Sequence, residues 1–407
     1  MTDHKKRIAI IGGGPAGLIA AQFLSALNKY DIHLYEQKAS VGRKFLIAGR
    51  GGLNLTHSED ATLFNNRYGW AEAFLTPYLS RFTPNDLRAW AADLGIETFV
   101  GSSGRVFPRE MKATNLMRAW TKKLTADGVT FHLRQTFTAI DKDNRPCFTD
   151  QTGEEASINA DAYLFALGGA SYPHLGADGR WSSPLEKQGI ALSPFKPMNC
   201  GFDVSWSSHI LKFEGQPLKN IAFSLGPEIA RGDAVLTRYG LEGGVIYALS
   251  RSLVLSLDQG GTTCPVLDLR PDLSATEISE RLTASRGKQS MPNYLRKRLK
   301  FSPIETALLR ELTGNVIASN PIALAKQIKA LPVTVNTSRP ISQAISTSGG
   351  ILMTELDDQL MLRKHPGWFA AGEMIDWDAP TGGYLLQACF STGIAAAKGM
   401  ENWLERN

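Results

Sequence analysis

The chain opens on a pattern that few folds accommodate: an apolar run, three spaced glycines, a helical stretch, a second strand and an acid. The β-branched run Arg7–Ile11 predicts a buried strand of a parallel sheet. Gly12, Gly14 and Gly17 follow in G-x-G-x-x-G spacing where a helix is predicted to begin, and Glu36 ends the second predicted strand. This order predicts a βαβ unit that binds a dinucleotide.

Each residue of this motif has a physical role. The first glycine allows a tight turn, the second lets a pyrophosphate approach the backbone, and the third lets the helix pack on the strand. Pro15 and Ala16 lie near the predicted start of the helix, where free N–H groups and partial positive charge attract phosphate. Glu36 is expected to bind the ribose hydroxyls, with Gln37 in the same site.

The same fingerprint serves NAD and FAD, so other segments must decide between them. A predicted strand at 368–371 closes on a Gly-Glu pair, as in the second nucleotide-contacting element of the glutathione-reductase-type FAD fold, which this pattern resembles. Another predicted strand, 161–169, ends in two glycines, and two more glycines open the final predicted helix, 384–404. We predict cofactor contacts from Gly168, Gly169, Gly372, Glu373, Gly382, Gly383 and Tyr384. Three separated segments that suit one cofactor favour FAD.

The length of 407 residues predicts two or three domains. We predict an α/β protein in which residues 1–192 and 332–407 form a discontinuous, Rossmann-like FAD-binding domain. Short alternating segments rich in proline and glycine predict an inserted β-rich domain at 193–270. The segments "SATEISERL", "IETALLREL" and "NPIALAKQI" predict a small helical domain at 271–331.

The composition, with 43% hydrophobic and 20% charged residues, is that of a globular protein. The sequence contains neither a run of eighteen apolar residues nor the charge pattern of a signal peptide, so we expect a cytoplasmic protein without a membrane partner. The four cysteines are dispersed, which argues against a disulfide reductase and a cysteine-rich zinc site. The sequence contains no cluster of side chains with metal-ligand spacing, and no metal is expected.

The stretch Val41–Asp60, "VGRKFLIAGRGGLNLTHSED", combines glycines with cations. We predict a loop that runs along the cofactor towards the isoalloxazine. Arg43 and Lys44 would offset pyrophosphate charge, or else lie in an exposed basic turn. Arg50 would face the flavin or an anionic substrate, because its small neighbours permit close approach. Asn54 would bind the pyrimidine edge of the flavin, or cap the next helix.

Five segments together resemble one family. They are "GRKFLIAGRGGLNLTHSE", "GRVFPREMKATNLMRAW", "ALGGASYPHLGADG", "LTRYGLEGGVIYALS" and "AAGEMIDWDAPTGGYLLQACFSTG". These are similar to the signature segments of the bacterial BaiN/RdsA-like NAD(P)/FAD-dependent oxidoreductases, also described as aminoacetone-oxidase-like. The resemblance implies a split FAD domain, a β-barrel-like insertion and a small helical domain. It also implies reduction of a conjugated C=C bond, with members linked to steroid-like enones and to uridine in ribosomal RNA.

The chain departs from this family at one place. The family commonly shows S-G-G-G-R-C-N where this chain has "AGRGGLN", residues 48–54, so Leu53 stands at the cysteine position. A thiol is therefore not available there, and cysteine chemistry cannot be carried over from the resemblance.

Reduction of a C=C bond needs a proton donor with suitable reach and pKa. The catalytic candidates are Tyr172 and His174 beside a cofactor segment, Arg238 and Tyr239 on the inserted domain, and Arg50, with His57 as a further proton donor. Any single histidine or tyrosine is more often structural. The three later Gly-Gly pairs lack dinucleotide spacing, so NAD(P)H is expected to visit the flavin transiently rather than to occupy its own domain.

The acceptor is predicted to be either a small molecule or RNA. Residues 281–300 contain seven Lys or Arg and no acid, which favours binding of phosphate, with Tyr294 available to stack on a base. A solvated helix face is the alternative explanation of such a run. The leading hypothesis is transfer of hydride from NAD(P)H through FAD N5 to a conjugated C=C bond. The alternatives are an amine-oxidising flavoenzyme and a non-catalytic, FAD-binding redox sensor.

Overall fold

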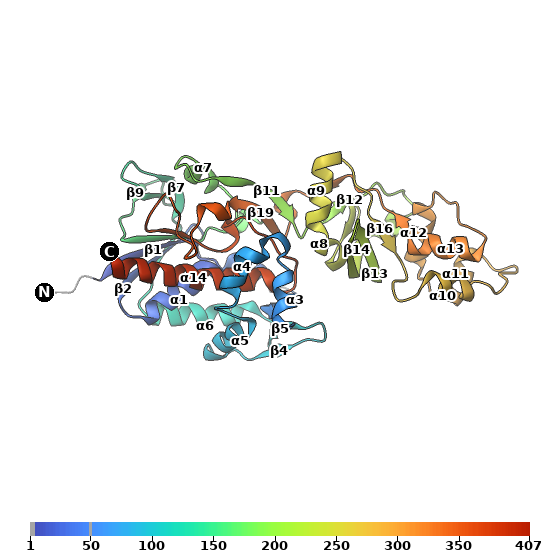
Figure 1. Ribbon diagram of the computed structural model, residues 1–407, viewed down its shortest axis with the longest axis horizontal. Coiled ribbons are helices and arrows are strands. Elements are labelled where there is room, and N and C mark those ends of the chain that lie inside the picture. The colour runs from blue at the N-terminus through green and yellow to red at the C-terminus, as the bar shows by residue number, and fades with distance from the viewer. Residues whose placement is uncertain (1–4, 49–50) are drawn as a thin grey trace. The chain divides into compact units, whose positions relative to one another are not determined.

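The computed structural model describes residues 5–48 and 51–407 (Figure 1). The chain divides into two compact units, Met1–Lys196 with Ser346–Asn407 and Pro197–Ile345. Each unit has a hydrophobic core of its own. The chain thus leaves the first unit and returns to it, while the further division of the middle segment into β-rich and helical domains stays a prediction.

The first unit is built on a parallel five-stranded sheet in the order β20, β10, β1, β2, β6. The strands are β1 (Lys6–Ile11), β2 (Tyr30–Glu36), β6 (Thr130–Leu133), β10 (Ala162–Phe165) and β20 (Trp368–Ala370). Residues 8–11 of β1 and all of β10 are buried, as expected of β-branched and aromatic strands covered on both faces. The predicted βαβ unit is confirmed.

Smaller elements surround this sheet. They are the sheet of β3 (Thr56–His57), β5 (Arg105–Pro108) and β4 (Thr98–Val100), the sheet of β7 (Thr136–Ile140), β8 (Pro146–Thr149) and β9 (Glu155–Ser157), and the pair β11 (Leu192–Met198) and β19 (Ser346–Ile351). The helices are α1 (Pro15–Ala26), α2 (Arg43–Ala48), α3 (Ala61–Asn66), α4 (Glu72–Leu79), α5 (Pro84–Asp93), α6 (Ala113–Ala126), α7 (Ser182–Glu186) and α14 (Tyr384–Arg406). The stretch 41–60, predicted as a loop, instead contains α2 and β3, because the apolar side chain of Phe45 is buried.

Helices α1 and α14 lie side by side (Figure 1). Their close approach depends on small residues: a Cβ atom added to Gly393 of α14 would lie 2.5 Å from the backbone oxygen of Ala16. The amino end of α1 is therefore held between the sheet and α14. None of the helices in the described ranges is both long and apolar enough to cross a membrane.

The second unit contains an antiparallel seven-stranded sheet in the order β17, β16, β13, β14, β15, β12, β18. Its strands are β12 (Phe202–Asp203), β13 (Pro217–Leu225), β14 (Glu228–Leu236), β15 (Gly240–Glu242), β16 (Val266–Asp268), β17 (Leu331–Pro332) and β18 (Thr337–Ser338). Its helices are α8 (Gly244–Ala248), α9 (Ser250–Gly260), α10 (Ala275–Arg281), α11 (Met291–Leu299), α12 (Pro303–Leu312) and α13 (Pro321–Lys329).

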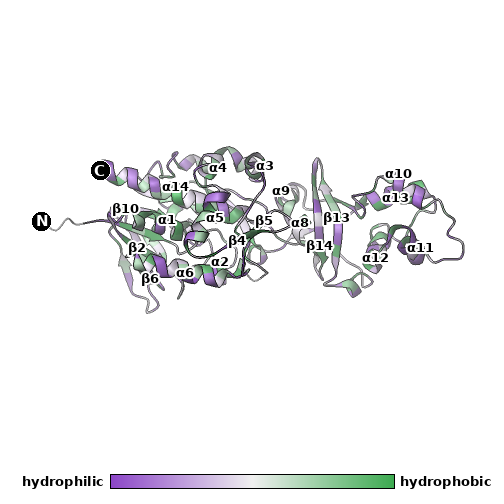
Figure 2. Ribbon diagram, turned by 90° about the horizontal axis from the view of Figure 1, so that it is seen from below, coloured by the Kyte–Doolittle hydropathy of each residue, from purple (hydrophilic) through white to green (hydrophobic). Residues whose placement is uncertain are grey.

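The three predicted helices of this unit are confirmed as α10, α12 and α13. Capping boxes begin two of them, Ser274 with Glu277 and Ser302 with Glu305, because each serine and glutamate satisfies backbone N–H groups of the first turn. Figure 2 shows α11 as mostly hydrophilic, in keeping with its Arg and Lys residues.

Candidate functional site

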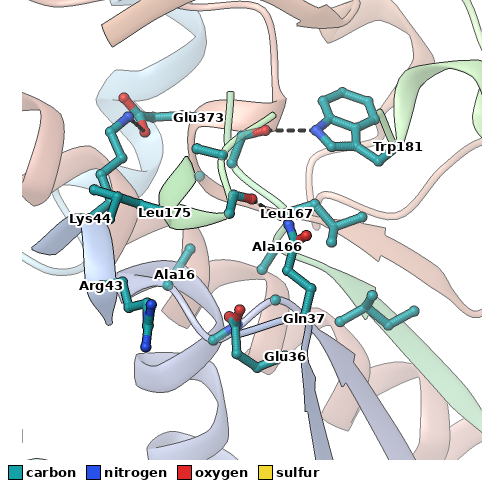
Figure 3. Close-up of a pocket in the computed structure, with 18 of the residues that line it drawn as sticks. Ala16, Glu36, Gln37, Arg43, Lys44, Ala166, Leu167, Leu175, Trp181 and Glu373 are labelled. Carbon is teal, nitrogen blue, oxygen red and sulfur yellow. Dashed lines mark hydrogen bonds and ion pairs between the residues drawn. The ribbon is translucent and has the colours of Figure 1, made fainter. Parts of the chain in front are cut away.

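An open cavity in the first unit lies at the carboxyl ends of the parallel strands, beside the amino end of α1 (Figure 3). This is where open parallel sheets bind their ligands. The walls come from the turn after β1, the ends of β2, β10 and β20, and the first residues of α2. The lining includes the predicted residues Gly12, Gly14, Pro15, Ala16, Glu36, Gln37, Arg43, Lys44, Gly168, Gly372 and Glu373.

The three fingerprint glycines divide into two roles. A Cβ atom on Gly12, whose φ is +115°, would lie 2.2 Å from the backbone oxygen of Ala166, and one on Gly17 would lie 2.1 Å from that of Gly12. A Cβ atom on Gly14 would meet no protein atom within 4 Å. Gly12 and Gly17 therefore permit packing, whereas the free space at Gly14 belongs to the cavity and fits a pyrophosphate.

The start of α1 offers hydrogen-bond donors to this space. Gly14 is the N-cap and Pro15 the first helical residue. The first intrahelical bond runs from the N–H of Leu18 to the oxygen of Gly14, at 2.9 Å. The N–H groups of Ala16 and Gly17 precede it and have no intrahelical partner, so they and the helix dipole suit an anion.

Glu36 is held in place by backbone donors. Its Oε2 accepts from the N–H of Gly13 at 3.0 Å, and its Oε1 accepts from that of Lys38 at 2.8 Å. Burial raises the pKa of Glu36, while these two hydrogen bonds act in the opposite direction. Each oxygen retains a lone pair, so the carboxylate is oriented and can still accept ribose hydroxyls.

Lys44 and Glu373 form an ion pair in the cavity wall, with 2.7 Å between Nζ and Oε2 (Figure 3). Lys44 belongs to α2, and Glu373 lies in the short helix η6 (Gly372–Met374) that follows β20. Their side chains are 25% and 12% exposed. A lone carboxylate here would repel an anionic cofactor, so the lysine makes the wall electrostatically compatible with a pyrophosphate.

Sequence reasoning missed part of the wall. These residues are Gln135, Thr136 and Phe137 before and within β7, and Leu175, Gly176, Ala177, Asp178, Arg180 and Trp181 after β10. The N–H of Gln135 donates to the oxygen of Glu36 at 3.0 Å, a contact that follows from the pairing of β6 with β2. The indole N–H of Trp181 donates to the backbone oxygen of Gly168 at 2.9 Å, and this hydrogen bond joins the two ends of the segment after β10.

Other predicted cofactor residues do not line this cavity. Gly169 packs on Thr347, whose Oγ1 would lie 2.1 Å from an added Cβ atom. A Cβ atom added to Gly383 would lie 2.5 Å from the Cα atom of Thr56. Gly383, just before α14, therefore packs on the segment that follows Asn54. Gly382 precedes this contact, and Gly17 lies within α1. Arg50 lies outside the described residues.

The position of the family's cysteine is a packing position in this chain. Leu53 is 0% exposed, and its N–H donates to the oxygen of Met111 at 3.0 Å. Leu53 is not among the residues that line the cavity. Next to it, the Oδ1 atom of Asn54 is buried without a partner among the described residues, which is costly unless a ligand donor satisfies it. Asn54 does not line the cavity described above, and its contact with a flavin ring stays a prediction.

The proton-donor candidates lie in different places. Tyr172 is half-buried with a φ of 60°, and its ring lies 6.0 Å from that of exposed His174, directly before the cavity residue Leu175. Arg238 is exposed and pairs with Glu214 at 3.4 Å.

Two further candidates are held by acceptors or neighbouring rings. The Tyr239 hydroxyl donates to Oε2 of Glu242 at 2.5 Å, and burial and that carboxylate raise the pKa of Tyr239. Nε2 of His57 lies 2.8 Å from the oxygen of Ser103, and its ring stacks on that of Tyr384. The catalytic roles of all these candidates stay predictions.

The stacking role predicted for Tyr294 is wrong. Tyr294 is 6% exposed, and its hydroxyl donates to the backbone oxygens of Leu282 at 2.5 Å and Ala284 at 3.1 Å. It lies on the buried face of the amphipathic helix α11, a distinction that a count of basic residues does not make. The exposed cations of the island are Arg281, Arg286, Lys288, Arg296, Lys297 and Lys300, and none forms an ion pair with another described residue.

Tyr35, in the cavity wall, stacks on His132 of β6 with 4.4 Å between ring centroids, and His132 in turn lies 2.8 Å from His33. Burial and the neighbouring His33 lower the pKa of His132 below its usual 6.5. The unfolded chain therefore takes up a proton that the folded chain resists. Neutral His132 therefore does not oppose folding above pH 6.5. As the pH falls below 6.5, protonation of His132 in the unfolded chain lowers the free energy of unfolding.

We therefore expect His132→Phe, which keeps the ring stack, to lose less melting temperature than the wild-type apoprotein when the pH is lowered from about 7.5 to about 5.5. Thermal unfolding followed by circular dichroism measures the difference. Equal losses in the two proteins would contradict the assignment to His132.

Comparison with known proteins identifies relatives. Residues 6–399 match the family model described as the HI0933-like protein Rossmann domain. A 3-dehydro-bile acid delta(4,6)-reductase of Clostridium scindens is 25% identical over 96% of this chain and 98% of that protein. A ribosomal RNA dihydrouridine synthase of Escherichia coli is 24% identical over 96% of each chain.

Solved structures share the fold at lower identity. An open flavocytochrome c3 fumarate reductase has a TM-score of 0.55 and 12% identity, over 98% of this chain and 79% of that one. A 3-ketosteroid delta1-dehydrogenase from Sterolibacterium denitrificans has a TM-score of 0.53 and 11% identity, over 98% of this chain and 100% of that one.

Proposed function

The chain belongs to the HI0933-like family, and we propose on this premise that it reduces a conjugated C=C bond with hydride from bound FAD. It is an FAD-dependent oxidoreductase. The observation that carries the assignment of the cavity is the free space at Gly14, in a cavity that the donors of α1 and the oriented carboxylate of Glu36 also line.

The names of two relatives favour the same type of reaction. One is a delta(4,6)-reductase, and the other makes dihydrouridine, which differs from uridine by two hydrogens across the ring C=C bond. Both products arise when a hydride and a proton add to a conjugated double bond. We therefore propose this addition for the present chain, with NAD(P)H as the transient source of the hydride.

The residues of the cavity would hold the cofactor by its charged and polar groups. The N–H groups at the start of α1 would bind the pyrophosphate, Glu36 the ribose, and Asn54 the ring edge. Lys44 keeps the wall beside Glu373 neutral. When bound, FAD supplies hydride transfer at its N5 atom. Tyr172, His174 and Tyr239 are the proposed proton sources for the second carbon, with Arg50 and Arg238 as proposed substrate contacts.

The reaction class is tested by anaerobic mixing of the FAD-loaded protein with NADH or NADPH. We expect one donor to bleach the oxidised-flavin absorbance and a conjugated enone or a uridine-containing RNA to restore it. An amine-oxidising enzyme would be bleached by an amine in the absence of either nucleotide. A redox sensor would be reduced without being reoxidised by any of these acceptors.

An RNA acceptor is the second candidate, and the exposed cations of residues 281–300 favour it. Six exposed cations, none of them in an ion pair with a described residue, favour binding of phosphates by release of counterions. The test compares Lys288→Glu, Arg296→Glu and Lys297→Glu in one protein with a matched control, Arg118→Glu, Lys122→Glu and Lys142→Glu, in the other unit.

We expect the first triple variant to weaken RNA binding by about 100-fold at low salt and to flatten its salt dependence, because three phosphate contacts are lost. The control should bind about as wild type does. Electrophoretic mobility shifts over a salt series measure both effects. Equal affinity of the two variants, or no RNA binding by the wild type, would leave the small enone as acceptor.

A further inference from the structure

The first residue of α14 is fixed by hydrogen bonds from a distant part of the sequence. The Tyr384 hydroxyl donates to Oε1 of Glu59 at 2.6 Å, and its backbone oxygen accepts from the Tyr68 hydroxyl at 2.8 Å. The guanidinium of Arg67 donates to both oxygens of Glu59, at 3.0 and 2.7 Å. Tyr384, Glu59 and Arg67 thus form one connected network.

The surroundings of this network are equally constrained. The Tyr384 ring stacks on the His57 ring, with the two centroids 5.5 Å apart. The guanidinium of Arg67 lies 5.9 Å from the centroid of the Tyr384 ring. The preceding glycine, Gly383, has a φ of +96° and touches the backbone of Thr56. The amino end of α14 is therefore held directly against the segment that follows Asn54.

The charges in the network are fixed. Burial alone would raise the pKa of Glu59, but hydrogen bonds from Arg67 and Tyr384 outweigh it and hold that pKa below its usual value. Burial and the adjacent carboxylate raise the pKa of Tyr384, which remains a neutral phenol. At neutral pH the carboxylate of Glu59 is therefore balanced by the guanidinium of Arg67. Nδ1 of His57 lies 3.9 Å from the same carboxylate.

Packing alone does not explain why an ion pair lies at the first residue of α14. A helix of 23 residues already buried against α1 does not need an ion pair at its first residue to be stable. The amino end of a helix carries partial positive charge, however, and its effect depends on its position and on the charges beside it. Cys389, within the same helix, lines the cavity, so α14 borders the proposed cofactor site.

We propose that Glu59, Arg67 and Tyr384 form a positioning network that holds the amino end of α14 and sets the charge beside it, and thereby tunes the reduction potential of bound flavin. This inference rests on the proposed function, because it assumes that FAD occupies the cavity. Reduction adds negative charge to a flavin, so positive charge nearby favours reduction and an unbalanced carboxylate opposes it.

The test is the flavin potential, measured by equilibration with a reference dye during slow enzymatic reduction. Arg67→Met leaves Glu59 unbalanced and should lower the potential by about 30 mV, which is a tenfold change in the equilibrium constant of a two-electron couple. Glu59→Gln leaves Arg67 unbalanced and should shift the potential the other way. The double variant should lie near wild type, and Tyr384→Phe should give a small decrease.

Controls separate this electrostatic role from a structural one. Lys123→Met removes one charge from the pair of exposed Lys123 on α6 with half-buried Asp127, the C-cap of that helix, and should leave the potential unchanged. A merely structural network would lower the melting temperature of every variant without shifts of opposite sign. Unchanged potentials, or shifts of one sign only, would overturn the inference, and Tyr384→Phe tests it if a charge variant does not fold. A wild type that binds no FAD would contradict the proposed function instead.

Discussion

Gly14→Val is expected to weaken FAD binding strongly without loss of the fold. A Cβ atom at this position meets no protein atom within 4 Å, so the folded protein accepts the side chain, which then fills the space beside the free N–H groups of α1. Removal of the pyrophosphate contact should weaken FAD binding by at least about 100-fold, or ~3 kcal/mol. Titration of the apoprotein with FAD, followed by quenching of flavin fluorescence, measures the loss.

Gly17→Ala is the contrasting variant. Its Cβ atom would lie 2.1 Å from the backbone oxygen of Gly12, so the turn or the helix must move, and the melting temperature of the apoprotein should fall. If Gly14→Val binds FAD as wild type does, the cavity is not the pyrophosphate site. If Gly14→Val also unfolds the protein, the space at Gly14 is not free for a side chain.

Lys44→Glu should have the second large effect. The substitution places two carboxylates together in a cavity wall that must also accept a pyrophosphate, and like charges at such a distance repel. We expect FAD affinity to fall by about 10- to 100-fold at low ionic strength, which corresponds to ~1.4 to 3 kcal/mol. Isothermal titration with FAD gives the affinity directly.

The reversed pair supplies the control. Lys44→Glu combined with Glu373→Lys restores an ion pair across the same wall and should recover most of the lost affinity, whereas Glu373→Lys alone should not weaken binding by charge repulsion. If the reversed pair binds as poorly as Lys44→Glu, the exact placement of the lysine rather than charge balance controls the affinity.

The parts of the fold and of the site that the sequence predicts depend on residues close together in the chain. The turn at Gly12, Gly14 and Gly17 and the acid at Glu36 belong to one contiguous βαβ unit, whose backbone requirements are visible in residue spacing. The strand before Gly372 and the glycines before α14 were predicted for the same reason, because positive φ values leave a glycine signature.

What could not be predicted depends on contacts between distant segments. The ion pair of Lys44 with Glu373 joins residues 329 positions apart, and no periodicity encodes it. Gln135 reaches the cavity only because β6 pairs with β2 in the register of Leu133 with Glu36. A count of basic residues does not distinguish the buried face of α11, where Tyr294 lies, from its exposed face. The hydrogen bond from the Tyr384 hydroxyl to Glu59 likewise joins residues that are far apart in the sequence.

The most direct test of the central claim is single-turnover mixing of the reduced, FAD-loaded protein with a conjugated acceptor without oxygen. The acceptors are a 3-oxo-4-ene steroid and a uridine-containing RNA, each analysed afterwards by mass spectrometry. We predict that at least one restores the oxidised-flavin absorbance and gains two hydrogens in the same turnover. A flavin that stays reduced with both acceptors, or that reoxidises while both acceptors remain unchanged, would contradict a C=C reductase.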